Sequence, residues 1–128
     1  MKAVEYLGRL ITIQLHTLHL PDCQLGDWRV ACLMRSIDKG NLQSLDISSN
    51  SVTAELNLQL ADLLTQNKEL VSLNLSDNQL YGSDFEKLVD QIIAHSSLKR
   101  LDLSSNNLGN EGFSVLFKPF IANKGSLQ

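Results

Sequence analysis

The densest group of side chains that could do chemistry lies in the stretch HTLHLPDC, which holds His16, His19, Asp22 and Cys23. Histidine, thiolate and carboxylate groups are the usual ligands of zinc, and a tetrahedral site needs them to converge. If this stretch is a strand, His16 and His19 are an odd number of residues apart and point to opposite faces. We therefore expect a structural role for this stretch and no metal site.

Serine, the other candidate for chemistry, recurs in three similar hexapeptides: LDISSN from Leu45, LNLSDN from Leu73 and LDLSSN from Leu101. A nucleophilic serine needs a neighbouring base and an oxyanion-binding group, and the sequence places neither beside any of the three copies. Small polar residues are, however, favoured wherever a chain turns. The sequence therefore predicts a protein that is no enzyme and uses no cofactor.

The hexapeptides belong to a longer repeat that follows the pattern L-x-x-L-x-L-x-x-N/C-x-L. Four units fit it, with starts at 15, 42, 70 and 98, so the steps are 27, 28 and 28 residues. The turn position of the pattern holds, in order, Cys23, Asn50, Asn78 and Asn106. Four matches in one register predict four stacked copies of one structural unit.

The second half of each unit is also periodic. Apolar pairs four residues apart recur at the same offset, which is typical of the buried stripe of a helix: Leu33 and Ile37, Leu60 and Leu64, Leu88 and Ile92, Leu116 and Phe120. Gly26 and Gly109 hold equivalent places where the chain must turn towards its helix. In the third unit, Ser83 and Glu86 have the spacing of a capping box. Each unit is therefore expected to be a strand, a turn and a helix.

The turn asparagines have a physical role in such a stack. Strands of neighbouring units would lie about 4.8 Å apart, with each leucine above its equivalent in the next unit. An asparagine amide both donates and accepts, so Asn50, Asn78 and Asn106 could satisfy backbone groups buried at the turns. Aromatic residues make up 5% of the chain and hydrophobic residues 43%, so the core should be mainly aliphatic.

The 28-residue step, the alternation of asparagine and cysteine at the turn, and the segment LGNEGFSVLF after the last strand resemble leucine-rich repeats of the ribonuclease-inhibitor type. Similar repeats occur in ribonuclease inhibitor, NOD-like receptors and the Ran GTPase-activating protein. The resemblance implies an α/β fold: a right-handed solenoid, part of a horseshoe, with a parallel concave sheet and convex helices. It also implies that partners dock on the concave face or on the strand-end loops.

The two ends of the chain give further expectations. Residues 1–14 are predicted to form a helix that covers the first unit, and residues 15–128 hold the four repeats and the first residues of a fifth. The fifth is indicated by Leu127, which lies 29 residues after Leu98. A solenoid needs a polar cap to close its core, and none is visible after the fourth unit. We therefore expect a fragment of a longer protein, or self-association through an uncapped C-terminal edge.

Residues between the strand leucines should point to the concave surface, because side chains alternate along a strand. Polar and charged residues fill these positions, and Lys99 and Arg100 mark the C-terminal end. The candidate partner-binding residues are Thr17, His19, Ser44, Asp46, Ser72, Asn74, Lys99, Arg100 and Asp102. A surface with this composition indicates a hydrogen-bonded, electrostatic contact with a protein that carries a basic patch. The alternative interpretation is ordinary solvated surface, which would have the same composition.

Charge and hydropathy exclude two classes of partner. The net charge is −3 and the isoelectric point is about 5.5, which is unsuited to binding nucleic-acid phosphates. No apolar run reaches the roughly 20 residues of a membrane-spanning helix. Two cysteines, Cys23 and Cys32, are too few for a disulfide framework, so we expect a cytoplasmic protein. The single tryptophan, Trp28, is expected to pack on the N-terminal helix, and the alternative is an exposed docking point.

The predicted function is a protein–protein interaction scaffold. Two alternatives stay open: part of a GTPase-activating protein similar to the Ran-directed family, and a ligand-sensing module of a larger receptor. An assay with a panel of small GTPases would test the first alternative, and a nucleotide-binding domain in the parent chain would favour the second.

Overall fold

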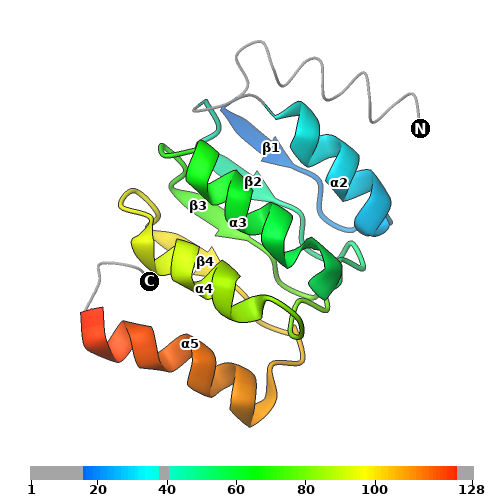
Figure 1. The fold of residues 1–128 in the computed structure, drawn as a ribbon. Helices are drawn as coiled ribbons and strands as arrows, with labels where there is room; N and C mark the ends of the chain where they lie inside the picture. The colour runs from blue at the N-terminus through cyan, green and yellow to red at the C-terminus, as the bar shows by residue number, and fades with distance from the viewer. Residues whose placement is uncertain (1–15, 38–40, 124–128) are drawn as a thin grey trace.

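The computed structural model describes residues 16–37 and 41–123. Within them, the element order is a strand and a helix, repeated (Figure 1). The strands are β1 (Thr17–His19), β2 (Ser44–Asp46), β3 (Ser72–Asn74) and β4 (Arg100–Asp102). The helices are α2 (Gly26–Ser36), α3 (Asn57–Gln66), α4 (Phe85–Ala94) and α5 (Gly109–Asn123), with a short 3₁₀ helix, η1 (Ala54–Leu56), before α3. The predicted helix over residues 1–14 and the start of a fifth unit lie outside the described residues.

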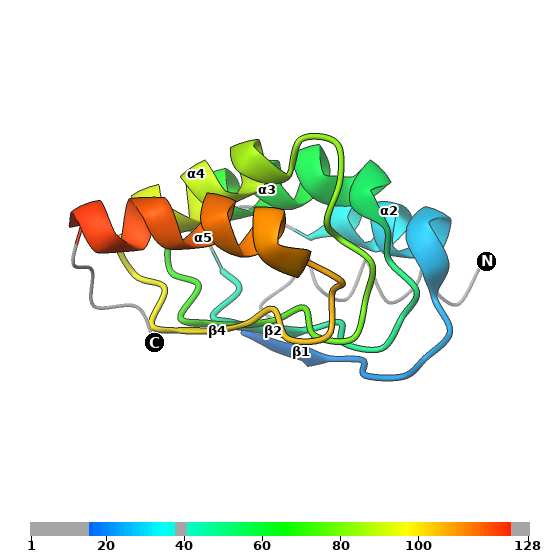
Figure 2. The same ribbon diagram turned by 90° about the horizontal axis from the view of Figure 1, so that it is seen from below.

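The strands form one parallel sheet in chain order, β1-β2-β3-β4. The helices form a second layer that covers one side of this sheet, as Figure 2 shows. Each connection from strand to parallel strand passes through a helix, which is the connection that parallel pairing requires. The α/β solenoid expected from the sequence is therefore confirmed. None of the helices in the described ranges has the length and apolar character needed to cross a bilayer.

The strand register brings equivalent leucines of successive coils side by side. Leu18 pairs with Leu45, Leu45 with Leu73, and Leu73 with Leu101. Leu45 and Leu73 are each 1% exposed, so this column lies in the core between sheet and helices. Burial of a leucine side chain stabilises the fold by roughly 1.5–3 kcal/mol, so the aliphatic column is a principal source of stability.

Asparagine side chains join the coils at their turns, as the sequence predicted. The Oδ1 atom of Asn78 accepts the backbone N–H groups of Asn50 at 3.1 Å and Val52 at 2.9 Å. Its Nδ2 donates to the carbonyl oxygen of Ile47 at 3.2 Å. Asn50 repeats this set on the first coil, with bonds to Cys23 N, Leu25 N and Leu20 O. The buried amides of Asn50 and Asn78 thus satisfy both donors and acceptors of the turns.

The first residues of the helices agree with one prediction and correct another. Gly26 and Gly109 have φ angles of +71° and +61°, the left-handed conformation that glycine adopts without steric cost. The predicted capping box at Ser83 is wrong, because α4 begins at Phe85 and its cap residue is Asp84. Asp84 has a φ of +66° and its side chain caps no backbone N–H of the helix. The carboxylate of Asp84 instead forms a salt bridge of 3.2 Å with Lys87.

Candidate functional site

The nine candidate residues all lie on or beside the strands, at positions between the core leucines. We call these nine residues the strand face. Five of them are exposed, namely Thr17, His19, Lys99, Arg100 and Asp102. The other four are partly buried, namely Ser44, Asp46, Ser72 and Asn74. Side-chain alternation is visible in β1, where Leu18 is 5% exposed between two exposed neighbours. The positions predicted to face away from the core therefore do so.

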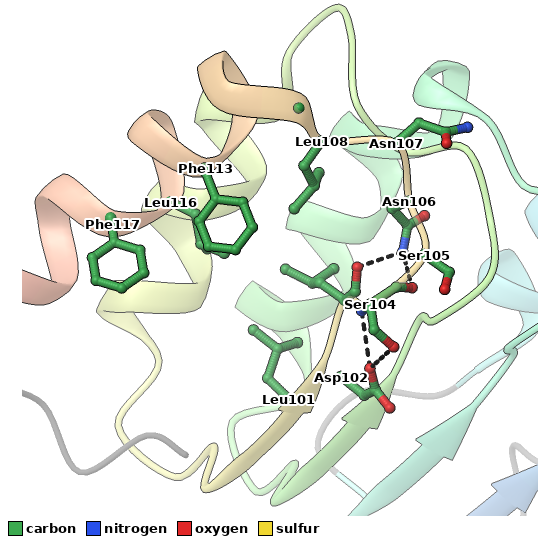
Figure 3. A pocket seen from close by; sticks show the side chains of 12 residues that line it. Leu101, Asp102, Ser104, Ser105, Asn106, Asn107, Leu108, Phe113, Leu116 and Phe117 are labelled. Atoms are coloured by element: carbon green, nitrogen blue, oxygen red, sulfur yellow. Dashed lines mark hydrogen bonds between the residues drawn. The ribbon is translucent and has the colours of Figure 1, made fainter.

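The acidic and amide side chains of the strand face are held by serines of their own coil. The Oδ1 atom of Asp46 accepts both the backbone N–H of Ser48 at 2.9 Å and its hydroxyl at 2.6 Å. Asn74 accepts the same two bonds from Ser76 at 3.0 and 2.7 Å. Asp102 accepts them from Ser104 at 2.9 and 2.6 Å (Figure 3). Each hexapeptide thus fixes the side chain at its second position through the serine that follows.

Further bonds cross between strands on this face. The Nε2 atom of His19 lies 2.8 Å from the hydroxyl oxygen of Ser44. The Nδ2 of Asn74 donates to the Oδ2 of Asp46 at 3.5 Å, a long and weak contact. At Asp102, the second carboxylate oxygen receives no hydrogen bond from any described residue, so it is available to a partner.

Charges of both signs lie at the C-terminal end of the strand face. Arg100 and Asp102 occupy β4 two residues apart, and Lys99 precedes that strand. Within residues 16–37 and 41–123, the one salt bridge joins Asp84 and Lys87, so Arg100 and Asp102 have no ion-pair partner there. Unpaired exposed charges steer and orient a charged partner.

The histidines and the thiol of the HTLHLPDC stretch bond separately. His16 precedes β1 and is exposed, and its Nδ1 lies 2.9 Å from the carbonyl oxygen of Asn41. His19 bonds to Ser44 as described above. Cys23 is exposed, with its Sγ 3.4 Å from the carbonyl oxygen of Pro21. His16, His19 and Cys23 thus each bond to a different protein group, namely Asn41, Ser44 and Pro21.

The strand-end loops are the second surface that the sequence indicated. Asp22, Ser49, Asp77 and Ser105 occupy the same place in successive coils, with φ angles of 52°, 56°, 52° and 57°. They line a polar hollow of about 550 Å³. The hydroxyl of Ser49 donates to Asp77 Oδ2 at 2.9 Å, so part of its polar surface is already bonded.

The prediction that Trp28 is packed is wrong. Trp28 lies in the first turn of α2 and is 58% exposed. The neighbouring Asp27 is the residue that joins the coils here, because its carboxylate accepts the backbone N–H and the hydroxyl of Thr53 at 2.7 and 2.6 Å.

A hollow at the C-terminal edge was not predicted in detail. It has a volume of about 570 Å³ between β4, the following loop and α5 (Figure 3). Phe113 and Phe117 lie on its helix side, with ring centroids 5.9 Å apart. Residues at the repeat position of Phe113 are buried in the earlier coils: Val30, Asn57 and Phe85 are 0%, 0% and 2% exposed, whereas Phe113 is 56% exposed. A comparison of the units would place Phe113 at a buried position, so its exposure could not be predicted from the repeat.

Tyr81 and Glu111 link the third and fourth coils beside this edge. The phenol of Tyr81 donates to Glu111 Oε2 at 3.4 Å. Partial loss of hydration raises the pKa of Tyr81 above its usual 10.0, and the negative charges of Glu111 and Glu86 raise it further.

Comparisons with known proteins identify the family to which the repeats belong. A Leucine Rich Repeat family model matches residues 41–63 and 69–90, and a second model of the same description matches residues 94–117. A comparison with curated proteins found no match. The fold is similar to the structure of Leiomodin-1 Actin-Binding Site 2, with a TM-score of 0.66 and 15% identity, over 96% of this chain and 75% of that one.

It is also similar to the tropomodulin C-terminal domain of Caenorhabditis elegans, with a TM-score of 0.56 and 16% identity over 96% of this chain and 92% of that one. At such identities the likeness concerns the fold. The ribonuclease-inhibitor subtype stays a prediction. The matched repeats and the four stacked strand-and-helix coils show that the chain belongs to the leucine-rich-repeat family.

Proposed function

We propose that the protein is an interaction scaffold that binds a partner protein across its strand face. The observation that carries this proposal is that hydrogen bonds fix the polar side chains of the strand face. Asp46, Asn74 and Asp102 are each fixed by two hydrogen bonds from a serine of their own coil. At the same time, Asp102 keeps one carboxylate oxygen free of any described partner, and Arg100 beside it forms no ion pair with a described residue.

Fixed side chains favour binding because their conformational freedom is already lost before the partner arrives. Ordering a flexible side chain at an interface costs about 0.5–1.5 kcal/mol, and the serine bonds of Asp46 and Asp102 reduce that cost. The carboxylates would accept hydrogen bonds from basic groups of the partner, and Lys99 with Arg100 would meet an acidic group at one end. We therefore expect a partner whose contact surface is mainly basic.

Asparagine is the substitution that separates charge from structure on this face. Asn74 accepts the same two serine bonds as the aspartates in the neighbouring coils, so asparagine fits this position of the repeat. The double variant Asp46→Asn/Asp102→Asn removes two negative charges and should keep the four serine bonds. Lysine at either position would remove the acceptor as well, and its effect on binding could not be separated from its effect on folding.

The experiment is a pull-down in which the wild-type chain and this double variant serve as baits. The double variant Asp62→Asn/Asp90→Asn is the control bait. Asp62 and Asp90 are exposed residues of α3 and α4, so the control makes the same charge change on the helix layer. Binding proteins should be retained by the wild type and the control and lost with Asp46→Asn/Asp102→Asn, at equal melting temperatures. Equal retention by all three baits would reject the strand face as the binding site.

Actin is the first defined partner to test in this format, because the similar leiomodin-1 structure is that of an actin-binding site. Binding of actin that depends on Asp46 and Asp102 would identify the partner class. If actin does not bind, the strand-face proposal is still tested by the comparison of the three baits described above. The strand-end loops, the GTPase-activating alternative and the ligand-sensing alternative stay predictions from the sequence.

A further inference from the structure

Asp46, Asn74 and Asp102 form a row across the strand face. The strand register pairs Asp46 with Asn74 and Asn74 with Asp102. Neighbouring strands lie about 4.8 Å apart, so the two carboxylates, which are two strands apart, are separated by about 10 Å. Serines of their own coils hold all three side chains, so this spacing is fixed before any partner binds.

The two ends of the row are carboxylates and its middle is a neutral amide. The Oδ2 atom of Asp102 receives no hydrogen bond from any described residue, and that of Asp46 receives only the 3.5 Å contact from Asn74. Within residues 16–37 and 41–123, neither carboxylate forms a salt bridge. Such carboxylates are strong acceptors for ammonium and guanidinium groups. The row therefore matches two basic side chains about 10 Å apart with a neutral side chain between them.

The secondary structure of the partner decides whether two of its side chains can share one face at this spacing. In an α-helix each residue rises about 1.5 Å, so residues seven positions apart lie on nearly the same face and about 10.5 Å apart. The residues three and four positions along the helix lie between them, opposite Asn74. In an extended strand, side chains on one face are about 6.8 Å or about 13.6 Å apart. A helix that crosses the strands thus fits the row better than a strand does.

Short side chains flank the row in the middle of the sheet. In the second and third coils, the positions two residues before and two residues after the row are all serine, namely Ser44, Ser48, Ser72 and Ser76. Longer side chains stand at the two ends of the face, with His19 on β1 and Arg100 on β4. A helix that lies along the row would therefore reach the carboxylates without meeting a bulky side chain on the middle strands.

We infer that the strand face binds an α-helix of the partner protein that carries two basic residues seven positions apart. The inference rests on the function proposed above and names the form of the partner. One basic residue would bond to Asp46 and the other to Asp102. A neutral polar residue between them, such as glutamine, would accept a hydrogen bond from Nδ2 of Asn74, which makes only the 3.5 Å contact with Asp46.

The strand-end loops offer a second pair of carboxylates two coils apart. Asp22 and Asp77 hold the same repeat position in the first and third coils. Both have a φ angle of 52°, in the left-handed region that asparagine also adopts readily. The variant Asp22→Asn/Asp77→Asn thus removes the same charge at the same coil separation from a neighbouring surface. It is the matched control for Asp46→Asn/Asp102→Asn.

The test measures binding of synthetic peptides to the full chain by fluorescence anisotropy. The first probe is an alanine-based helical peptide of about 18 residues with two arginines seven positions apart. In the second peptide the arginines are five positions apart, which places them on different faces of the helix. The third is the first peptide with prolines in place of two alanines between the arginines, which breaks the helix. The wild-type chain should bind the first peptide about fivefold more tightly than the other two, because only that peptide pairs both arginines.

This preference should disappear in Asp46→Asn/Asp102→Asn and remain in Asp22→Asn/Asp77→Asn. Equal binding of the three peptides, or no binding of the first, would overturn the inference. A preference that only Asp22→Asn/Asp77→Asn abolishes would overturn it too, and would place the helix on the strand-end loops. If the peptides fail while the pull-down still depends on Asp46 and Asp102, the helix alone is rejected. If the pull-down is also independent of both residues, the strand face is rejected with it.

Discussion

The backbone N–H of Asn50 donates to the side-chain Oδ1 of Asn78, 3.1 Å away and one coil further along the chain. Asn50 in turn receives the N–H of Cys23 at 3.0 Å on its own Oδ1. Each of these coils is thus completed by an amide of the next coil. The turn asparagines therefore determine how the coils follow one another, in addition to shaping their own loops.

Asn78→Ala should strongly destabilise the protein. The change leaves the buried N–H groups of Asn50 and Val52 without an acceptor, at about 1–3 kcal/mol each. We expect the free energy of unfolding to fall by roughly 2–6 kcal/mol in urea denaturation. Gln79→Ala, at the exposed neighbouring residue, is the control and should change it by less than about 0.5 kcal/mol. A fall no larger than that of the control would contradict the role of the amide.

Gly112→Ala should destabilise the protein although alanine favours helices. A Cβ at Gly112 would lie 2.8 Å from Leu108 Cβ and 3.1 Å from the ring of Tyr81. Such overpacking costs about 1–3 kcal/mol, against a propensity gain of about 1 kcal/mol. The exposed Ser114→Ala in the same helix is the control and should be neutral or slightly stabilising. A melting temperature of Gly112→Ala above that of Ser114→Ala would contradict this expectation.

His95 should carry its proton on Nε2 when neutral. Its Nδ1 accepts the backbone N–H of Leu98 at 3.1 Å, and its Nε2 lies 2.9 Å from the carbonyl oxygen of Asn67. A carbonyl can only accept, so Nε2 must donate and Nδ1 must be unprotonated. Long-range ¹⁵N–¹H NMR spectra of the ring at neutral pH should show the Nε2–H tautomer. The Nδ1–H tautomer would mean that this link between coils does not form.

Glu111→Gln should lower the pKa of Tyr81. Partial desolvation raises this pKa first, and the negative charge of Glu111 and its hydrogen bond raise it further, because both oppose formation of the phenolate. Because the pKa of Tyr81 is higher in the folded than in the unfolded chain, the free energy of unfolding falls as the pH rises above the unfolded-state pKa of about 10. Ultraviolet titration of tyrosinate, with Tyr81→Phe to subtract Tyr6, measures the shift. An unchanged titration in Glu111→Gln would show that the two side chains do not interact.

Much of this structure could be predicted because the repeat determines it. A leucine at the same offset in every unit must lie above its equivalent, and Leu45 and Leu73 do. The turn asparagine could be interpreted from its chemistry, because an amide can both donate and accept in a buried turn. The resemblance to a known repeat added the handedness and the layer order, which the spacing alone does not give.

Other features depend on neighbours that one unit does not reveal. Asp84 adopts a left-handed conformation at the start of α4, so the serine before it does not cap the helix. The exposure of Phe113 is not evident from its repeat position, since Phe85 at the same position of the third coil is buried. The serine bonds that hold Asp46 and Asp102 could have been predicted from the hexapeptides, where a serine always follows two residues later.

The stacking of coils is tested most directly by native-state hydrogen exchange of the backbone amides that join them. The N–H groups of Leu20, Ile47 and Leu75 donate to the following coil at 2.8, 3.1 and 2.8 Å, respectively. In the free chain we predict that Ile47 and Leu75 exchange only through global unfolding, because each N–H is held by the following coil. Fast exchange at Ile47 and Leu75 would contradict a parallel stack of coils.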